Sequence, residues 1–289
     1  MKKFSSISKN KHITNITIGK FDSIHLAHKT LIRALDKNGA VIIIAFKGDL
    51  GGTNQYILTQ RDKKRYISHP IYAIKFDKIK NLSGKKFLKY LQKKLPSLRK
   101  IIVGEDFRFG KNRANSANDI PKISHLEVQI LPEMRIGKIP VHSQNIRAFL
   151  AQGAVDSANL LLGRKYSIKG RVVRGQGIGG MRVFPTINAL VRDHVLPQNA
   201  VYATRTRIKG KVYNSISFIG RRVSADNNFA IESHILGDFA PKSNEILGKK
   251  IEIFLIQKIR DNAKFSDLNA LKKQIACDIK EARAILGNL

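Results

Sequence analysis

The order of strand-like and helix-like segments constrains this fold more than any other feature. In the first half of the chain, short apolar segments alternate with amphipathic segments of helical spacing. Residues 41–46 (VIIIAF) are apolar on both faces, which is typical of a central strand in a parallel sheet. This half predicts a doubly wound, Rossmann-like α/β domain. We expect its strands at 13–19, 41–46, 71–76, 100–104 and 126–131, and its helices at 26–37, 59–68 and 83–95.

The pattern changes after a helical stretch at 143–162. Residues 166–257 contain short alternating segments with Gly and Asn turns and no helical segment between them. Within them, Ile208-Lys209-Gly210-Lys211 is typical of a hairpin turn. Such strands pair antiparallel, so we expect a small closed β-barrel followed by one helix. We expect strands at 167–173, 200–208, 211–219, 230–235 and 250–256, a helix at 266–286, and domains at 1–163 and 164–289.

Residues 19–28 (GKFDSIHLAH), here called the histidine turn, join the first expected strand to the first expected helix. His25 and His28 are three residues apart and lie on one face of that helix start. In an open α/β sheet this junction binds phosphates, because free amides and the helix dipole point at the anion. A zinc site requires three or four ligands, and no Cys or carboxylate cluster lies nearby to complete one. On this segment alone, ordinary surface or core histidines remain an equal alternative.

Two further segments are expected near the same sheet edge. Residues 101–111 (IIVGEDFRFGK) end a buried strand with a charged loop bounded by glycines. That loop leaves the sheet at its carboxyl edge, where ligands bind, and an ordinary surface loop does not explain its two phenylalanines. Residues 142–147 (HSQNIR) begin a helix, in which Ser143 suits an N-cap and Arg147 suits a phosphate contact.

The barrel half carries a glycine-rich loop and a hydroxyl–amide pair. Backbone amides of residues 175–180 (GQGIGG) are suited to wrap phosphates. Thr186 and Asn188 are two residues apart on a backbone fixed by Pro185, so their oxygens point the same way and suit Mg²⁺. Glu232, in a later strand, is suited to accept a hydroxyl proton. Each feature alone is usually structural, and only their combination indicates a phosphate-transfer site.

The charge balance is 53 Lys+Arg against 21 Asp+Glu. This excess attracts polyanions in general, including nucleic acid and ATP. The basic residues are nevertheless spread along the chain, and clusters such as Lys63-Lys64-Arg65 and Lys85-Lys86 are typical of solvated helix faces. No zinc-finger, KH or RNP pattern is present, so we expect no specific nucleic-acid partner.

The expected location is the cytoplasm. Residues 1–5 have no apolar segment of a signal peptide, and the longest apolar runs are far shorter than a membrane span. The single cysteine, Cys277, excludes a disulfide framework.

Together these segments resemble the bacterial bifunctional riboflavin kinase/FMN adenylyltransferase family, the prokaryotic FAD synthetases. The resemblance covers nearly the whole chain in the same order. The matching segments are 19–28 (family GxFDGxHxGH), 104–110 (GxDFRFG), 159–166 (ANxLLGRPY), 185–188 (PTxN), 232–234 (ExH) and 260–265 (RxxxKF).

The resemblance implies two ATP-dependent steps on small-molecule substrates. Riboflavin would become FMN in the barrel, and FMN would become FAD in the first domain with release of pyrophosphate. It implies that His25 and His28 stabilise phosphate charge and that Glu232 deprotonates the ribityl hydroxyl. Thr186 and Asn188 would hold Mg²⁺. The residues implied to bind ATP or flavin are Gly19, Phe21, Asp22, Asp106, Phe107, Arg108, Phe109, Ser143, Arg147, Gly175, Gly177, Gly179, Pro185 and Arg260.

The chain departs from the family pattern mainly in the first domain. Ser23 and Ala27 replace glycines, residues 47–49 (KGD) replace a Pro-His-Pro motif, and residues 142–144 (HSQ) replace Ser-Ser-Thr. In the barrel, Val183 replaces a glycine and residues 222–224 (RVS) replace Arg-Pro-Thr. Two alternatives stay open: a riboflavin kinase with a degenerate first domain, and a basic RNA-binding or regulatory protein. The sequence gives no oligomeric state.

Overall fold

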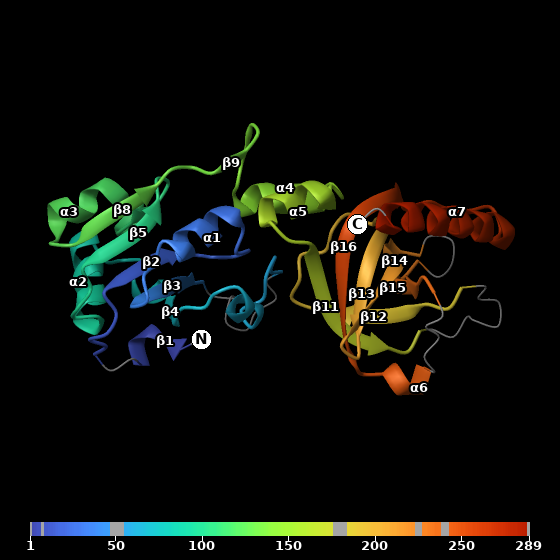
Figure 1. Ribbon diagram of the computed structural model, residues 1–289, viewed down its shortest axis with the longest axis horizontal. Helices are drawn as coiled ribbons and strands as arrows, with labels where there is room; N and C mark the ends of the chain where they lie inside the picture. The colour runs from blue at the N-terminus through green and yellow to red at the C-terminus, as the bar shows by residue number, and fades with distance from the viewer. Residues whose placement is uncertain are drawn as a thin grey trace. The chain divides into compact units, whose positions relative to one another are not determined.

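The computed structural model describes residues 2–6, 9–46, 55–175, 184–222, 227–237 and 243–287, except the side chains of 243 and 244. The chain divides into unit 1, Met1–Ser143, and unit 2, Gln144–Leu289 (Figure 1). The boundary was expected after residue 163, which would place the two helices between residues 143 and 162 in the first domain. Their contacts instead assign them to unit 2.

Unit 1 is built on one six-stranded sheet in which all neighbouring strands are parallel. Its strands are β1 (Lys2–Lys3), β2 (Asn15–Gly19), β3 (Gly39–Ala45), β4 (Ile71–Lys75), β5 (Lys100–Gly104) and β8 (Glu127–Leu131). Their order is β1-β4-β3-β2-β5-β8, so the chain reverses direction across the sheet between β2 and β5. This topological switch point is where open α/β sheets bind ligands.

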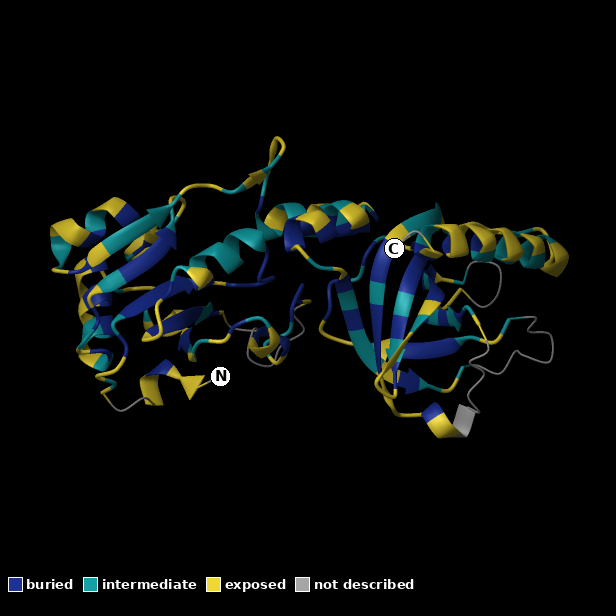
Figure 2. Ribbon diagram, in the orientation of Figure 1, coloured by how far each residue is buried: buried dark blue, intermediate teal, exposed yellow. Residues whose placement is uncertain are grey.

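Apolar side chains cover both faces of the sheet, which confirms the doubly wound prediction. Val41 and Ile42 are consecutive in β3 and point to opposite faces. Ile42 shares an apolar cluster with Phe87 and Leu91 of α2 (Gly84–Lys94), whereas Val41 shares another with Ile32 of α1 (Leu26–Arg33). In Figure 2 the central strands are accordingly buried along most of their length. The helices of unit 1 are α1 (Leu26–Arg33), α2 (Gly84–Lys94) and α3 (Ile120–Ile123), with 3₁₀ turns η1 (Phe4–Ser6), η2 (Asp62–Arg65), η3 (Phe76–Lys78), η4 (Lys111–Arg113) and η5 (Ala117–Asp119).

The helix expected at 59–68 is wrong, because only η2 forms there. Pro70 begins the approach to β4, and a residue that precedes proline is pushed out of the helical region. The strand β1 was also missed. Unit 1 further contains two small antiparallel pairs, β6 (Arg108–Phe109) with β7 (Asn115–Ser116) and β9 (Arg135–Ile136) with β10 (Ile139–Pro140). Strands of two residues carry no alternation for a sequence pattern to detect.

Unit 2 contains the predicted closed antiparallel barrel. Its strands are β11 (Tyr166–Val173), β12 (Ile187–Val191), β13 (Ala200–Ile208), β14 (Lys211–Arg221), β15 (Phe229–Ile235) and β16 (Lys250–Asp261), closed in the order β11-β12-β15-β14-β13-β16. The predicted hairpin joins β13 to β14 through Lys209 and Gly210, both at positive φ, as a type I′ turn requires. The strand β12 was missed, since only five residues follow the proline segment.

Helices cover parts of the barrel surface. The helical stretch expected at 143–162 is broken at Gly153, whose φ is +75°, into α4 (Ser143–Ala151) and α5 (Val155–Leu162). The Asn159 amide of α5 donates to the Leu255 carbonyl of β16, while its oxygen accepts from the Tyr166 amide. No helix was expected within 166–257, but a four-residue helix, α6 (Ser243–Ile246), precedes β16. The C-terminal α7 (Leu268–Gly287) packs against β13 and β14.

Candidate functional site

The histidine turn lies at the carboxyl end of β2, at the switch point predicted for a ligand. Phe21 and Ile24 are both at φ +47°, a left-handed conformation that is rare for a β-branched residue such as Ile24. A Cβ at Gly19 would lie 3.1 Å from the Phe21 ring, so this glycine allows the chain to fold back closely. Strained backbone of this kind concentrates at functional sites.

His25 and His28 are brought together at the start of α1. Their rings stack with centroids 3.6 Å apart, and the Phe21 ring lies 4.7 Å from that of His28. His25 is 5 % exposed and caps α1, its Nδ1 accepting from the His28 amide at 3.2 Å. Asp22, also predicted at this site, is buried in the same turn. The two imidazoles therefore lie at a helix N-terminus, where an anion is favoured.

The loop of residues 104–110, here called the aromatic loop, leaves β5 beside this turn, because β5 pairs directly with β2. Phe107 and Phe109 stack with ring centroids 5.7 Å apart, and Phe109 also contacts Phe87 of α2 at 5.9 Å. Asp106 and Arg108 are exposed. The loop thus combines packed aromatic rings with charged side chains that are exposed to solvent.

Ser143 is held by Ser23, a residue that departs from the family pattern. Their hydroxyl oxygens are 3.0 Å apart, and Ser23 is fully buried. The predicted phosphate contact Arg147 follows on α4 and belongs to unit 2. The histidine turn and Ser143 are therefore joined by a direct hydrogen bond within unit 1.

In the barrel, β12 and β15 bring the predicted kinase residues together. Asn188 pairs directly with Glu232 across the two strands, and Thr186 immediately precedes β12. Asn188 is 9 % exposed, and Thr186 is half-buried. Hydroxyl, amide and carboxylate oxygens therefore gather at one end of β12. This donor set suits a hard cation such as Mg²⁺.

Glu232 and the proline segment are both fixed by neighbours. The Arg222 guanidinium donates to the Glu232 carboxylate at 3.2 Å, with both side chains mostly buried. His234 Nδ1 donates to the Pro185 carbonyl at 2.8 Å, and the Phe184 ring meets the His234 ring edge-on. The Glu232 side chain and the Pro185 backbone are therefore each held by a hydrogen bond. Among the described residues no group of three or more His, Cys, Asp or Glu is placed to hold a metal.

The glycine-rich loop and Arg260 were also predicted to contact a ligand. Gly175 is described, whereas Gly177 and Gly179 lie outside the described residues. Arg260 contacts the Asp278 carboxylate of α7 at 2.8–3.0 Å and lies over the Phe265 ring. Arg260 therefore joins β16 to α7, and its contact with a ligand stays a prediction.

Five buried hydroxyls inside the barrel form a closed hydrogen-bonded ring that the sequence analysis missed. Successive oxygens are 2.7–3.1 Å apart, and every member is 0 % exposed. The members of this hydroxyl ring, in order, are Thr204, Ser215, Thr206, Ser233 and Ser217. Ser233 directly follows Glu232, so the ring fixes the strand that carries the predicted base. The two-residue spacing of Thr204 with Thr206 and of Ser215 with Ser217 was the available signal.

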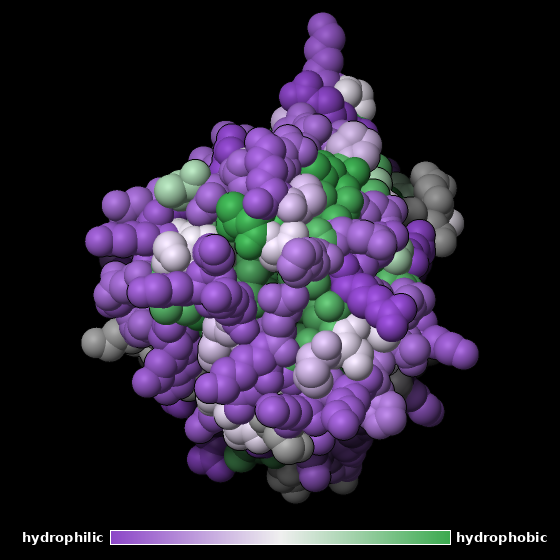
Figure 3. Space-filling model, turned by 90° about the vertical axis from the view of Figure 1, so that its left-hand side faces the viewer, coloured by the Kyte–Doolittle hydropathy of each residue, from purple (hydrophilic) through white to green (hydrophobic). Residues whose placement is uncertain are grey.

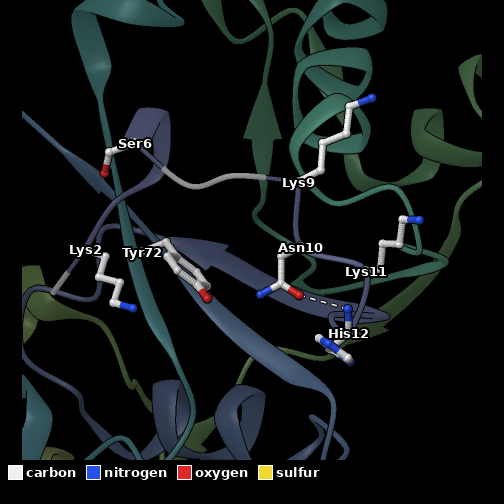
Figure 4. Close-up of a pocket in the computed structure, with 7 residues that line it drawn as sticks. All are labelled: Lys2, Ser6, Lys9, Asn10, Lys11, His12 and Tyr72. Atoms are coloured by element: carbon white, nitrogen blue, oxygen red, sulfur yellow. Dashed lines mark hydrogen bonds between the residues drawn. The ribbon is translucent and has the colours of Figure 1, made fainter.

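A cavity of about 470 Å³ lies at the opposite edge of the unit 1 sheet (Figure 4). It is lined by basic and polar residues, including Lys2, Lys9, Lys11, His12 and Tyr72. Lys2 pairs with Tyr72 near the start of β4, so the cavity lies at the amino ends of the strands. Ligands of open sheets bind at the carboxyl ends, and this cavity is separate from the histidine turn.

Lysines cover the outer face of α2. Figure 3 looks onto the end of unit 1 that bears α2 and α3, and hydrophilic side chains dominate it. Lys85, Lys86 and Lys89 are exposed, whereas Phe87 and Leu88 between them are buried. The Lys85-Lys86 cluster is therefore a solvated helix face, as predicted.

A doubly wound parallel sheet followed by a small closed antiparallel barrel, with these sites, defines a two-domain phosphate-transferring enzyme. Residues 7–145 match the FAD synthetase family and residues 162–286 match the riboflavin kinase family. The chain belongs to the bifunctional riboflavin kinase/FMN adenylyltransferases, as the sequence motifs predicted.

Relatives of that name cover nearly the whole chain. The protein of Buchnera aphidicola from Acyrthosiphon pisum is 34 % identical, over 91 % of this chain and 90 % of its own length. The protein of Escherichia coli K12 is 30 % identical, over 94 % of this chain and 92 % of its own. A crystal structure named as a macrolide-efflux protein from Streptococcus pneumoniae has a TM-score of 0.83 and 25 % identity, covering 98 % and 97 % of the two chains. In the described part of this chain, no helix is long and apolar enough to cross a bilayer.

Proposed function

We propose that this chain phosphorylates riboflavin to FMN in unit 2 and adenylylates FMN to FAD in unit 1. The observation that carries the proposal is the pairing of Asn188 with Glu232 beside Thr186 in a closed barrel. The two family matches, one for each unit, support it. We place the enzyme in the cytoplasm, in accord with its single cysteine.

In the kinase step, Glu232 accepts the proton of the ribityl hydroxyl, whose oxygen attacks the γ-phosphate of ATP, and ADP leaves. Thr186 and Asn188 provide oxygen ligands for Mg²⁺, a cation that needs few protein ligands because it keeps water and substrate phosphates. When bound, Mg²⁺ neutralises the charge that develops on the phosphate. Arg222 orients the Glu232 carboxylate, and Gly175 contacts the nucleotide. Positioning then supplies most of the acceleration.

In the adenylyltransferase step, a phosphate oxygen of FMN attacks the α-phosphate of ATP, and pyrophosphate leaves. His25 and His28 donate hydrogen bonds to the oxygens that gain charge, at the N-terminus of α1. Ser143 binds the departing phosphates, and the aromatic loop shapes the flavin side. The contact of Arg147 with these phosphates stays a prediction. The stacked imidazoles and the neighbouring β5 loop support this assignment.

The test is a time course of the purified chain with riboflavin and Mg-ATP, in which flavins are separated by chromatography. We expect FMN to appear first and FAD to follow. Accumulation that stops at FMN would favour the degenerate first domain that Ser23 and Ala27 suggest. Absence of FMN would refute the kinase assignment.

A further inference from the structure

Lys63 is buried beside the histidine turn, although the Lys63-Lys64-Arg65 cluster was expected to face solvent. Its side chain is 2 % exposed, whereas Lys64 and Arg65 are exposed. Only one face of the short η2 helix meets solvent, so the prediction is wrong for its first lysine. Burying an ammonium group is costly unless it is hydrogen-bonded or paired. A lysine in this position therefore needs a specific role.

One contact of Lys63 is with the histidine turn itself. Its Nζ donates to the carbonyl oxygen of Lys20 at 3.5 Å. Lys20 is the first residue after β2 and directly precedes Phe21, the first residue at positive φ. The ammonium therefore holds the backbone at the point where the chain leaves the sheet and begins its left-handed fold.

The segment that carries Lys63 contacts the turn at a second point. The Leu58 amide donates to the Asp22 carbonyl at 3.2 Å. Between the two contacts, the Thr59 hydroxyl donates to the Asp62 carboxylate at 2.7 Å, which fixes the start of η2. The turn is thus held through two of its carbonyls by one ordered segment.

The turn requires such support because it is strained. Left-handed conformations are unfavourable for side chains other than glycine, and Phe21 and Ile24 both adopt them. Strained residues persist only where the surroundings determine them. His25 follows Ile24 directly, so relaxation of the turn would move the stacked imidazole pair.

We propose that Lys63 is a positioning residue for FMN adenylylation. It holds the histidine turn, and thereby His25 and His28, in the geometry that stabilises the transferred phosphate. This inference rests on the proposed adenylyltransferase function of unit 1. The wild-type protein separates failure of the function from failure of the inference. If wild type forms no FAD, the proposed function is refuted. If wild type forms FAD, the effect of replacing Lys63 tests the inference alone.

The test compares Lys63→Met with Lys64→Met, which removes the same charge from an exposed neighbour. FAD formation from added FMN and Mg-ATP is measured at saturation, and FMN formation from riboflavin serves as a control in the same chain. We expect Lys63→Met to lower the adenylylation kcat about 10- to 100-fold, because a displacement of about 1 Å costs about 100-fold. KM for FMN should change less than threefold, and the kinase rate should stay unchanged. Lys64→Met should leave both rates within twofold.

An adenylylation kcat of Lys63→Met within twofold of wild type would overturn the proposal. If Lys63→Met unfolds unit 1 by circular dichroism, Lys63→Arg decides, because guanidinium keeps the charge and the donors. A folded Lys63→Arg protein with at least a third of the wild-type kcat supports positioning by a cationic donor. If Lys63→Arg folds but is inactive, or if Lys63→Met and Lys63→Arg both unfold, the positioning proposal is overturned and Lys63 is purely structural.

Discussion

The hydroxyl oxygens of Ser23 and Ser143 are 3.0 Å apart, although the two residues are 120 positions apart in the chain. Ser23 replaces a glycine of the family motif, and Ser143 stands in a segment that has lost one hydroxyl of the family's Ser-Ser-Thr. In such a pair one hydroxyl donates to the other, and the acceptor keeps its own proton. The serine at position 23 therefore gives the turn a further connection.

We expect Ser23 and Ser143 to be coupled energetically. Ser23→Ala and Ser143→Ala should each lower the free energy of unfolding of unit 1, and the double variant should lose less than the sum by about 0.5–1.5 kcal/mol, the net value of one hydrogen bond. Urea denaturation of the four proteins measures this coupling. Strict additivity would show that the contact contributes nothing.

His25 has two separable roles, one in capping α1 and one at the phosphate. His25→Asn keeps a good capping residue but removes the imidazole, whereas His25→Ala removes both. We expect both variants to lower FAD formation about 10²- to 10³-fold, in line with the loss of one transition-state donor. Only His25→Ala should also lose stability, by about 1 kcal/mol. Rates of FMN and FAD formation and thermal melting together test this, and full FAD formation by His25→Asn would exclude the electrostatic role.

Glu232 is expected to act in the kinase step alone. Glu232→Gln keeps the shape but removes the base, and it should lower FMN formation about 10²- to 10⁴-fold. FAD formation from added FMN should not change. The matched control is Glu252→Gln, since Glu252 is another buried, ion-paired glutamate of the barrel, held by Arg207 at 2.9 Å. A similar loss in both variants would mean that barrel stability, and not the base, was measured.

The hydroxyl ring should contribute to barrel stability. Thr206→Val keeps the shape of the side chain but leaves Ser215 and Ser233 each without one ring partner, at a cost of about 1–3 kcal/mol. Thr206→Ser keeps the hydroxyl and loses one methyl group, worth about 0.8 kcal/mol. Denaturant unfolding of the two variants should therefore rank Thr206→Val as the less stable. The reverse order would show that packing outweighs the ring.

The Asp119 carboxylate should make unit 1 sensitive to acid. Hydrogen bonds from the Ser116 amide at 2.8 Å and the Ser116 hydroxyl at 3.0 Å hold the pKa of Asp119 below its ordinary value. Because the pKa is lower in the folded state, the stabilisation is complete above the ordinary aspartate pKa and is lost as the pH falls through the folded value. In thermal melts from pH 6 to pH 3, the melting temperatures of wild type and Asp119→Asn should converge as the pH falls. A wild-type advantage over Asp119→Asn that is as large at pH 3 as at pH 6 would contradict this prediction.

Fold class followed from patterns that act over a few residues. Val41–Phe46 was apolar on both faces because both faces of β3 are covered, and the lack of a helical sequence pattern within 166–257 left antiparallel closure as the expected outcome. Where neighbouring geometry overrode local preference, as at 59–68 before Pro70, the prediction was wrong. Strands of two residues, such as β1, carried too little pattern to detect.

The sequence by itself determined the two-part fold, the family, and the residue types at each site, because hydrophobic periodicity and motif spacing are local properties of the chain. Only the tertiary structure decided which side chains meet. It placed the aromatic loop beside the histidine turn by pairing β5 with β2, and it set Asn188 opposite Glu232 through strand register. It also buried Lys63 under the turn and closed the hydroxyl ring, since burial and contact between distant segments arise only when the whole chain packs.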